Sequence, residues 1–178
     1  MSDVRLSSSP ALAGKIPIDT PLISVKALAE GCVVHVLSKA GTDVATTLSR
    51  WAGADRSVRA AAPDQWFIVG DAPLAHAELR DLFDQLPPEA TGVDLSHGRV
   101  RIGISGPMVE RVLAKGTGVD LALSVFPVGH STTTLSGHIS VHITRTAQSA
   151  FELMVMRGFA ESLWDDLIQM STEFVDVS

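Results

Sequence analysis

The chain has 178 residues, enough for one domain or for two small halves that share a core. Its 20 acidic and 14 basic residues give a net charge of −6, and the basic residues are scattered, which argues against nucleic-acid binding. Only 19% of residues are charged and the mean hydropathy is +0.25, so either the core is large or a partner covers apolar surface.

The first 30 residues alternate Pro, Gly, Ser and short apolar pairs, which is typical of an arm or irregular lead-in. They lack the long apolar core of a signal peptide, and no run in the chain approaches the roughly 18 apolar residues of a membrane span. Cys32 is the only cysteine and begins an apolar run, so we expect a buried structural thiol. We therefore expect a soluble, cytoplasmic protein with one α+β domain over residues 31–178.

Regular elements become readable from residue 32 onward. In chain order, strands are predicted over 32–37, 65–69, 99–104, 132–135, 138–144 and 149–155, and helices from 42 or 43 to about 51 and over 73–86, 107–114 and 159–170. Pro87 and Pro88 end the second helix, and Gly137 marks a turn between two strands. The strand beginning at Arg99 alternates polar and apolar residues, which indicates one half-buried face.

An internal repeat relates the two halves of this pattern. Residues 65–86 and 151–170 each read as a strand followed by a helix, and each pair is preceded by an earlier strand and helix, at 32–51 and 99–114. The repeat predicts two similar αβ halves that share a mixed or antiparallel sheet. Chance similarity is the alternative, because strand–helix pairs are common.

The combination of Asp94, Ser96 and His97 invites comparison with a Ser-His-Asp triad. Sequence neighbours in an extended chain point to opposite faces, so Ser96 and His97 cannot easily meet. A nucleophile-elbow sequence is also absent from this stretch. We expect Asp94 and Ser96 to cap a turn, and we assign no catalytic residue.

Metal and nucleotide sites are also not expected. His138 and His142 would lie roughly 13 Å apart along one strand face, too far to bind one ion. The glycines at 98, 103 and 106 do not match a dinucleotide fingerprint, and Lys115 lacks the preceding glycines of a phosphate loop. We therefore predict that this chain binds no metal and no cofactor.

Arginines are the strongest remaining candidates for an interaction. Arg99 and Arg101 share one face of their strand, and a guanidinium suits a carboxylate on a partner protein or a small ligand. Internal ion pairs with residues such as Asp94 or Asp120 are the alternative. The candidate interface or ligand residues are His97, Arg99, Phe126 and Arg145, and the apolar, loop-rich segments 1–30 and 120–130 are the candidate interface segments.

A series of short motifs runs in order over about residues 60–170. These are Pro63-Asp64-Gln65-Trp66, Val93-Asp94-Leu95-Ser96-His97-Gly98-Arg99, Ser105-Gly106-Pro107, Ala114-Lys115-Gly116, Val119-Asp120-Leu121, Phe126-Pro127-Val128-Gly129, Ile143-Thr144-Arg145-Thr146 and 151–164. Together they resemble the gamma subunit of heterotetrameric sarcosine oxidase, a flavin enzyme that demethylates sarcosine to glycine. Gln65, Thr117 and Thr144 depart from the family pattern, so a subunit of a related N-methyl amino acid oxidase stays an alternative.

The resemblance implies a fold like the folate-binding domain of the glycine-cleavage aminomethyltransferase. It also implies a non-catalytic, structural subunit that packs on a large alpha subunit, with beta and delta subunits in the same complex. FAD, FMN, NAD and tetrahydrofolate would then be bound by the partner subunits. The alternative within this fold is a stand-alone folate- or anion-binding protein, in which Arg99 or Arg145 pairs with a carboxylate.

Overall fold

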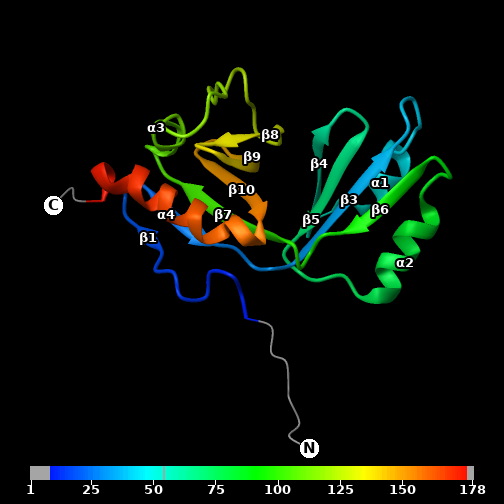
Figure 1. Cartoon of the computed structure of the whole chain (residues 1–178). Helices are drawn as coiled ribbons and strands as arrows, with labels where there is room; N and C mark the ends of the chain where they lie inside the picture. The colour runs from blue at the N-terminus through cyan, green and yellow to red at the C-terminus, as the bar shows by residue number, and fades with distance from the viewer. Residues whose placement is uncertain (1–8, 54, 176–178) are drawn as a thin grey trace, which may run out of the picture.

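Two lobes, each built on an antiparallel sheet, make up the computed structural model, which describes residues 9–53 and 55–175 (Figure 1). The strands are β1 (Ile18–Asp19), β2 (Ser24–Ala27), β3 (Cys32–Ser38), β4 (Arg56–Ala62), β5 (Gln65–Gly70), β6 (Ala90–Asp94), β7 (Arg99–Ser105), β8 (Ser131–Ser136), β9 (Ile139–Ala147) and β10 (Ala150–Met156). The helices are α1 (Ala45–Trp51), α2 (His76–Gln85), α3 (Val109–Leu113) and α4 (Ala160–Ser171), with 3₁₀ turns η1 (Arg157–Phe159) and η2 (Thr172–Phe174). No helix in these ranges is long and apolar enough to cross a membrane.

The larger lobe is a six-stranded sheet in the order β1-β2-β7-β10-β9-β8. Alternate residues of β10, among them Phe151 and Leu153, point to its outer face and are almost fully buried. They pack in one cluster with Leu163 and Leu167, which lie four positions apart on α4 and so share one helix face. This apolar cluster is the main core of the protein.

The smaller lobe is a four-stranded sheet in the order β4-β5-β3-β6, covered by α1 and α2. Val34 and Val36 of β3 and Ile68 of β5 alternate with residues of the other face, and they pack against Leu48 of α1 and Leu82 of α2. Each lobe therefore has its own core, on the side away from the other lobe.

The two halves are related by a repeat in which one strand is exchanged. β3 leads into α1 and β5 into α2, just as β7 leads into α3 and β10 into α4. The strand before each half pairs with the opposite half: β2 pairs with β7, with Lys26 opposite Gly103, and β6 pairs with β3, with Val93 opposite His35. The predicted α+β class and the two similar halves are thus confirmed, and the halves share strands between two sheets rather than one common sheet.

Parts of the chain that were expected to be irregular contribute strands. The sequence predicts an arm or lead-in over residues 1–30, yet β1 and β2 lie within this range. Residues 1–8 of it lie outside the described residues. β2 is held in the sheet because Ile23 and Val25 are fully buried in the larger core. β4 and β6 were also not predicted, because their Arg-, Ala- and Gly-containing sequences carry little strand propensity.

The inner faces of the two sheets meet at a small apolar contact of Val33, Phe67, Val69 and Met154. Along one side of this contact, the edge strands β8 and β4 approach each other, and Ser131 Oγ donates a hydrogen bond to a backbone carbonyl oxygen of β4 at 2.9 Å. This apolar contact is smaller than the core of either lobe. Polar groups around it therefore also contribute to the attachment of one lobe to the other.

Candidate functional site between the two lobes

The turn containing Asp94, Ser96 and His97 is organised by its own hydrogen bonds. Asp94 Oδ1 accepts from the backbone N–H of Ser96 at 3.0 Å and from its hydroxyl at 2.5 Å. Ser96 Oγ in turn accepts from the N–H of Val33 at 3.1 Å. The expected capping turn is therefore present, and His97 is exposed beside it.

Phe126 and Arg145 meet inside the larger lobe. Arg145 has no exposed surface, and its Nε donates to the backbone oxygen of Phe126 at 2.7 Å. Its remaining contacts are the carbonyl oxygens of Gln148 and Leu121 and, at 2.8 Å, the carboxylate of Glu110. Through these contacts, the guanidinium of Arg145 holds the loop between α3 and β8 against the sheet.

Arg99 and Arg101 share the inner face of β7, as their spacing predicts. Arg99 is half-buried, its guanidinium carbon lies 5.9 Å from the centre of the Phe67 ring, and burial lowers its pKa. Arg101 is 6% exposed and forms ion pairs within the chain, with Glu152 and Asp71 rather than with Asp94 or Asp120.

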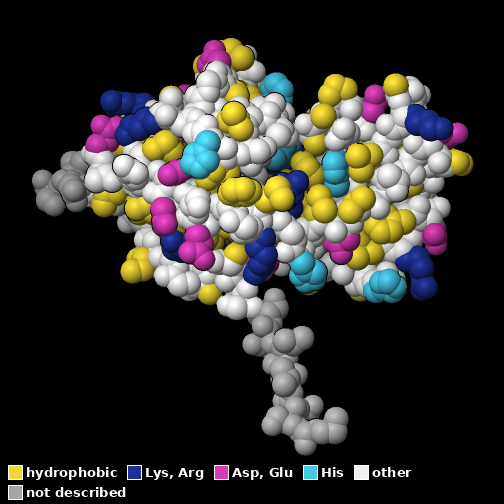
Figure 2. All heavy atoms as spheres, in the orientation of Figure 1, with side chains coloured by type: hydrophobic (Ala, Val, Ile, Leu, Met, Phe, Trp, Pro, Cys, Tyr) yellow, Lys and Arg dark blue, Asp and Glu magenta, His cyan; other side chains and the backbone are white. Residues whose placement is uncertain are grey.

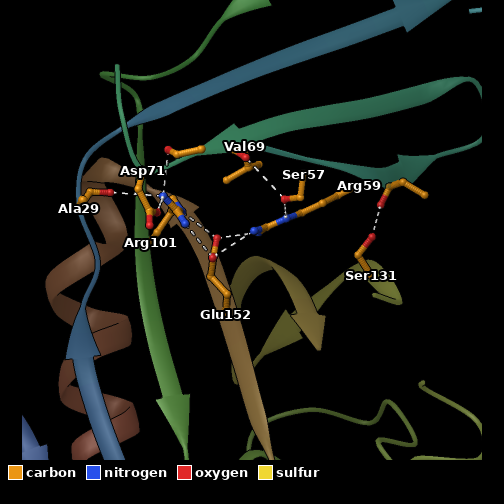
Figure 3. A network of polar contacts seen from close by, with 10 residues as sticks. Ala29, Ser57, Arg59, Val69, Asp71, Arg101, Ser131 and Glu152 are labelled. Carbon is orange, nitrogen blue, oxygen red and sulfur yellow. Dashed lines mark hydrogen bonds and ion pairs between the residues drawn. The ribbon is translucent and has the colours of Figure 1, made fainter. Parts of the chain in front are cut away.

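A buried charge cluster joins the lobes, with the carboxylate of Glu152 between two guanidinium groups (Figure 3). Arg59 on β4 donates to the two carboxylate oxygens at 2.6 and 3.1 Å, and Arg101 on β7 donates to the same oxygens at 2.8 and 2.9 Å. Arg59 also donates to Ser57 Oγ at 2.9 Å. Both guanidinium groups thus bind one carboxylate in the two-pronged geometry that makes such pairs strong.

The electrostatics of the cluster favour its charged form. Burial opposes ionisation of Glu152, but the hydrogen bonds and charges of Arg101 and Arg59 outweigh it and lower the pKa of Glu152 to about 2. Burial likewise opposes the charge on Arg101, and the bonds to Glu152 and Asp71 raise its pKa above the usual value. Glu152 is therefore a carboxylate at neutral pH and acts as an ion-pair partner.

Sequence reasoning missed this cluster because its members come from three separate strands. A signal was present: Glu152 lies between Phe151 and Leu153 in an otherwise apolar strand, where an isolated carboxylate requires a partner. The sequence does not show which arginine supplies that partner, since Arg59 is 93 positions away.

An open pocket of about 360 Å³ lies beside the charge cluster. Its lining includes Arg56, Arg59 and Arg101 together with Asp55 and Asp71. Each arginine already contacts an acidic side chain, since Arg56 is paired with a glutamate of α2 at 3.1 Å. The pocket is thus lined by opposite charges that neutralise one another.

A second polar group lies between the lobes, next to the apolar contact. His142 of β9 is 3% exposed, and its ring meets the Phe67 ring edge-on at 5.0 Å. Phe67 also lies 4.7 Å from the ring of His35. Burial, followed by the charge on Arg59, lowers the pKa of His142 to about 4, so its imidazole is neutral at pH 7.

The inter-lobe groups can make ion pairs and hydrogen bonds. Thr133 Oγ1 lies 3.3 Å from Nδ1 of His142, whereas Nε2 of His142 has no hydrogen-bond partner in the part of the chain that the structure describes. His138 lies in the exposed turn before β9 and not on the face of His142. Within residues 9–53 and 55–175, no three His, Cys, Asp or Glu side chains are grouped to bind a metal ion.

Comparisons with known proteins agree with this fold. The family model of the sarcosine oxidase gamma subunit matches residues 26–173. The structure of heterotetrameric sarcosine oxidase from Corynebacterium sp. U-96 in complex with pyrrole 2-carboxylate contains a chain that is 20% identical, with a TM-score of 0.84 over 96% of this chain and 98% of that chain. A search among curated proteins finds no match to the sequence.

A transferase also has this fold. The glycine cleavage system aminomethyltransferase T from Bartonella henselae is 17% identical, with a TM-score of 0.60, and the match covers 81% of this chain and 45% of that chain. The expected likeness to the aminomethyltransferase fold is confirmed, and this chain corresponds to less than half of that enzyme.

Proposed function

The chain belongs to the sarcosine oxidase gamma subunit family, and from this premise we propose that it works as the gamma subunit of a heterotetrameric sarcosine oxidase. The match over residues 26–173 is the observation that carries the proposal, and it confirms the resemblance seen in the short motifs. The likeness in fold extends over 98% of one chain of a solved heterotetrameric sarcosine oxidase.

In the proposed complex, the N-methyl group of sarcosine is oxidised. The oxidised carbon is then released as formaldehyde by reaction with water or is transferred to tetrahydrofolate. With water and O₂, sarcosine gives glycine, formaldehyde and hydrogen peroxide; with tetrahydrofolate, the methylene group is carried away on the folate. FAD, FMN, NAD and tetrahydrofolate are assigned to the alpha and beta subunits, and the delta subunit completes the complex. We place the complex in the cytoplasm.

The role assigned to this chain is structural. It is supported by the charge cluster between the lobes, in which Arg59 and Arg101 both bind the carboxylate of Glu152. It is also supported by Arg145, whose guanidinium holds a loop of its own chain. We propose that the chain stabilises the large alpha subunit, with no catalytic residue of its own.

Native co-purification tests this function. The chain would be tagged in its own cells and isolated at moderate salt, with an untagged strain as the control, and the chains that accompany it would be identified. A yellow complex with flavoprotein chains that produces hydrogen peroxide from sarcosine is expected. A colourless chain that arrives alone and binds tetrahydrofolate would instead support the folate-binding alternative.

A further inference from the structure

The inner faces of the two sheets carry apolar side chains that neither lobe covers. Met156 of β10 and Leu135 of β8 are 53% and 55% exposed, and Val93 of β6 is 45% exposed. Met156 lies two residues after Met154, so both point to the inner face, and Leu135 lies two residues after Thr133, which is opposite His142. These three side chains are therefore exposed on the inner faces of the two sheets, and the space between these faces is called the inter-lobe groove below.

The same groove contains a cation without an acidic partner. Arg99 is directly opposite Met156 across β7 and β10. Among the described residues no carboxylate pairs with Arg99, whereas Arg101, two positions along the same face, binds Glu152 and Asp71. A half-buried guanidinium loses hydration and gains only the face of the Phe67 ring, so an added carboxylate would be bound favourably.

A buried polar atom without a partner lies on the same inner face of the larger sheet. His142 Nε2 is buried without a hydrogen-bond partner, and its ring contacts Phe67, which also contacts His35 and Arg99. Buried polar atoms in folded proteins almost always have partners, and among the described residues Ser38 Oγ and Thr144 Oγ1 share this exception. Figure 2 shows hydrophobic side chains on both sides of the junction between the lobes, with basic and histidine side chains among them.

We propose that this inter-lobe groove, defined by Val93, Arg99, Leu135 and Met156, binds a segment of another subunit in which a carboxylate lies beside apolar side chains. The inference rests on the proposed function, because it takes its occupant from the heterotetramer. The carboxylate pairs with Arg99, and the apolar neighbours cover the exposed side chains of both lobes. Binding then also fixes the two lobes relative to each other.

The surface fits a protein segment better than a small carboxylate or a second copy of this chain. The pocket of about 360 Å³ beside the charge cluster is lined by other residues, and the groove is open between two lobes. The four residues that define the groove include no acid, so a second copy placed groove to groove would bring Arg99 against its own equivalent.

Site-directed cross-linking in the assembled complex tests the contact. Val93→Cys introduces an exposed thiol into a chain whose only cysteine, Cys32, is fully buried, so a thiol-linked photo-cross-linker attaches at one place. The expected product joins this chain to another subunit. Arg80→Cys, on the exposed side of α2, is the matched control and should give no such product. A product that joins two copies of this chain overturns the assignment.

Charge reversal gives a second, independent readout. Arg99→Glu and Met156→Glu should each reduce the partner chains retained in a salt wash by about tenfold or more, and Arg80→Glu should not. Circular dichroism of each isolated variant checks that it is folded. The groove assignment is wrong if wild type and the charge-reversal variants retain their partners equally and Val93→Cys gives no cross-link. The subunit function still stands in that case, because wild type retains its partners. If wild type retains no partner, both proposals fail.

Discussion

Arg59 and Glu152 are 93 positions apart and belong to different lobes, yet two hydrogen bonds of 2.6 and 3.1 Å join the guanidinium to the carboxylate. Arg101 binds the same carboxylate from the other side. The ion pair is almost completely buried, so losing one partner leaves a charge without compensation. Glu152 thus links the smaller lobe, through Arg59, to the larger lobe.

Glu152→Gln should destabilise the fold strongly, because it leaves the buried guanidinium of Arg59 without an anion and leaves Arg101 with Asp71 alone. We expect a loss of about 3 kcal/mol in the free energy of unfolding, measured by urea denaturation. Glu161→Gln is the control, since Glu161 is 72% exposed and 3.9 Å from its lysine partner, and should change stability by less than about 0.5 kcal/mol. Equal effects of the two substitutions would show that the inter-lobe cluster contributes little.

Stability should fall on mild acidification because of His142. Its pKa is about 4 in the folded chain against 6.5 ordinarily, so between these values the unfolded chain binds the additional proton and stability decreases as the pH falls. From about pH 7.5 to about pH 5 the expected loss is about 2 kcal/mol. The low pKa of Glu152, about 2, adds no loss in this window, because its contribution is lost only below the ordinary value of 4.5.

Urea titrations at the two pH values, with His142→Gln and His138→Gln, separate this effect from the other histidines. Arg59, Glu152, Arg99 and His35 are the charged and titratable groups whose fields act on His142. His142→Gln should remove most of the acid-induced loss, and His138→Gln, at an exposed turn, should leave it unchanged. Burial also lowers the pKa of His35, so some acid-induced loss remains in His142→Gln, and an acid response of undiminished size in this variant would contradict the assignment.

The loop between α3 and β8 depends on Arg145. Arg145→Met removes the hydrogen bonds to the carbonyl oxygens of Phe126, Leu121 and Gln148, which are then left without these donors. We expect a stability loss of about 2–4 kcal/mol, with faster amide hydrogen exchange over residues 121–129 than in wild type. Arg80→Met, on the surface of α2, is the control. If hydrogen exchange over residues 121–129 is unchanged in Arg145→Met, Arg145 does not hold this loop.

Local sequence patterns were enough to predict much of the fold. The short buried strand β5 before α2 and the alternating strand β7 before α3 follow from periodicity and from proline and glycine positions. The exchange of β2 and β6 between the halves could not be predicted, because the pairing of Lys26 with Gly103 is fixed by tertiary packing and not by a local signal.

The candidate site shows the same division. The sequence places Arg99 and Arg101 on one face, but it does not show that Arg101 has a buried acidic partner and Arg99 has none among the described residues. That difference depends on Glu152 facing the second lobe, which is a property of the three-dimensional arrangement. Phe126 and Arg145 were predicted as candidate interface or ligand residues, and the structure places both of them buried within the larger lobe, where they contact each other.

Gly31→Ala should strain the crossing between the lobes. Gly31 lies between β2 and β3, and a Cβ at this position would overlap the backbone of Gly70 and Asp71. That backbone cannot move freely, because Gly70 ends β5 and its carbonyl oxygen accepts a hydrogen bond from Arg101 at 3.1 Å. We expect a loss of about 2–3 kcal/mol in urea denaturation. Gly98→Ala is the matched control, since its Cβ would meet only the Leu95 carbonyl oxygen at an ordinary 3.6 Å, and equal stabilities would contradict the close approach at Gly31.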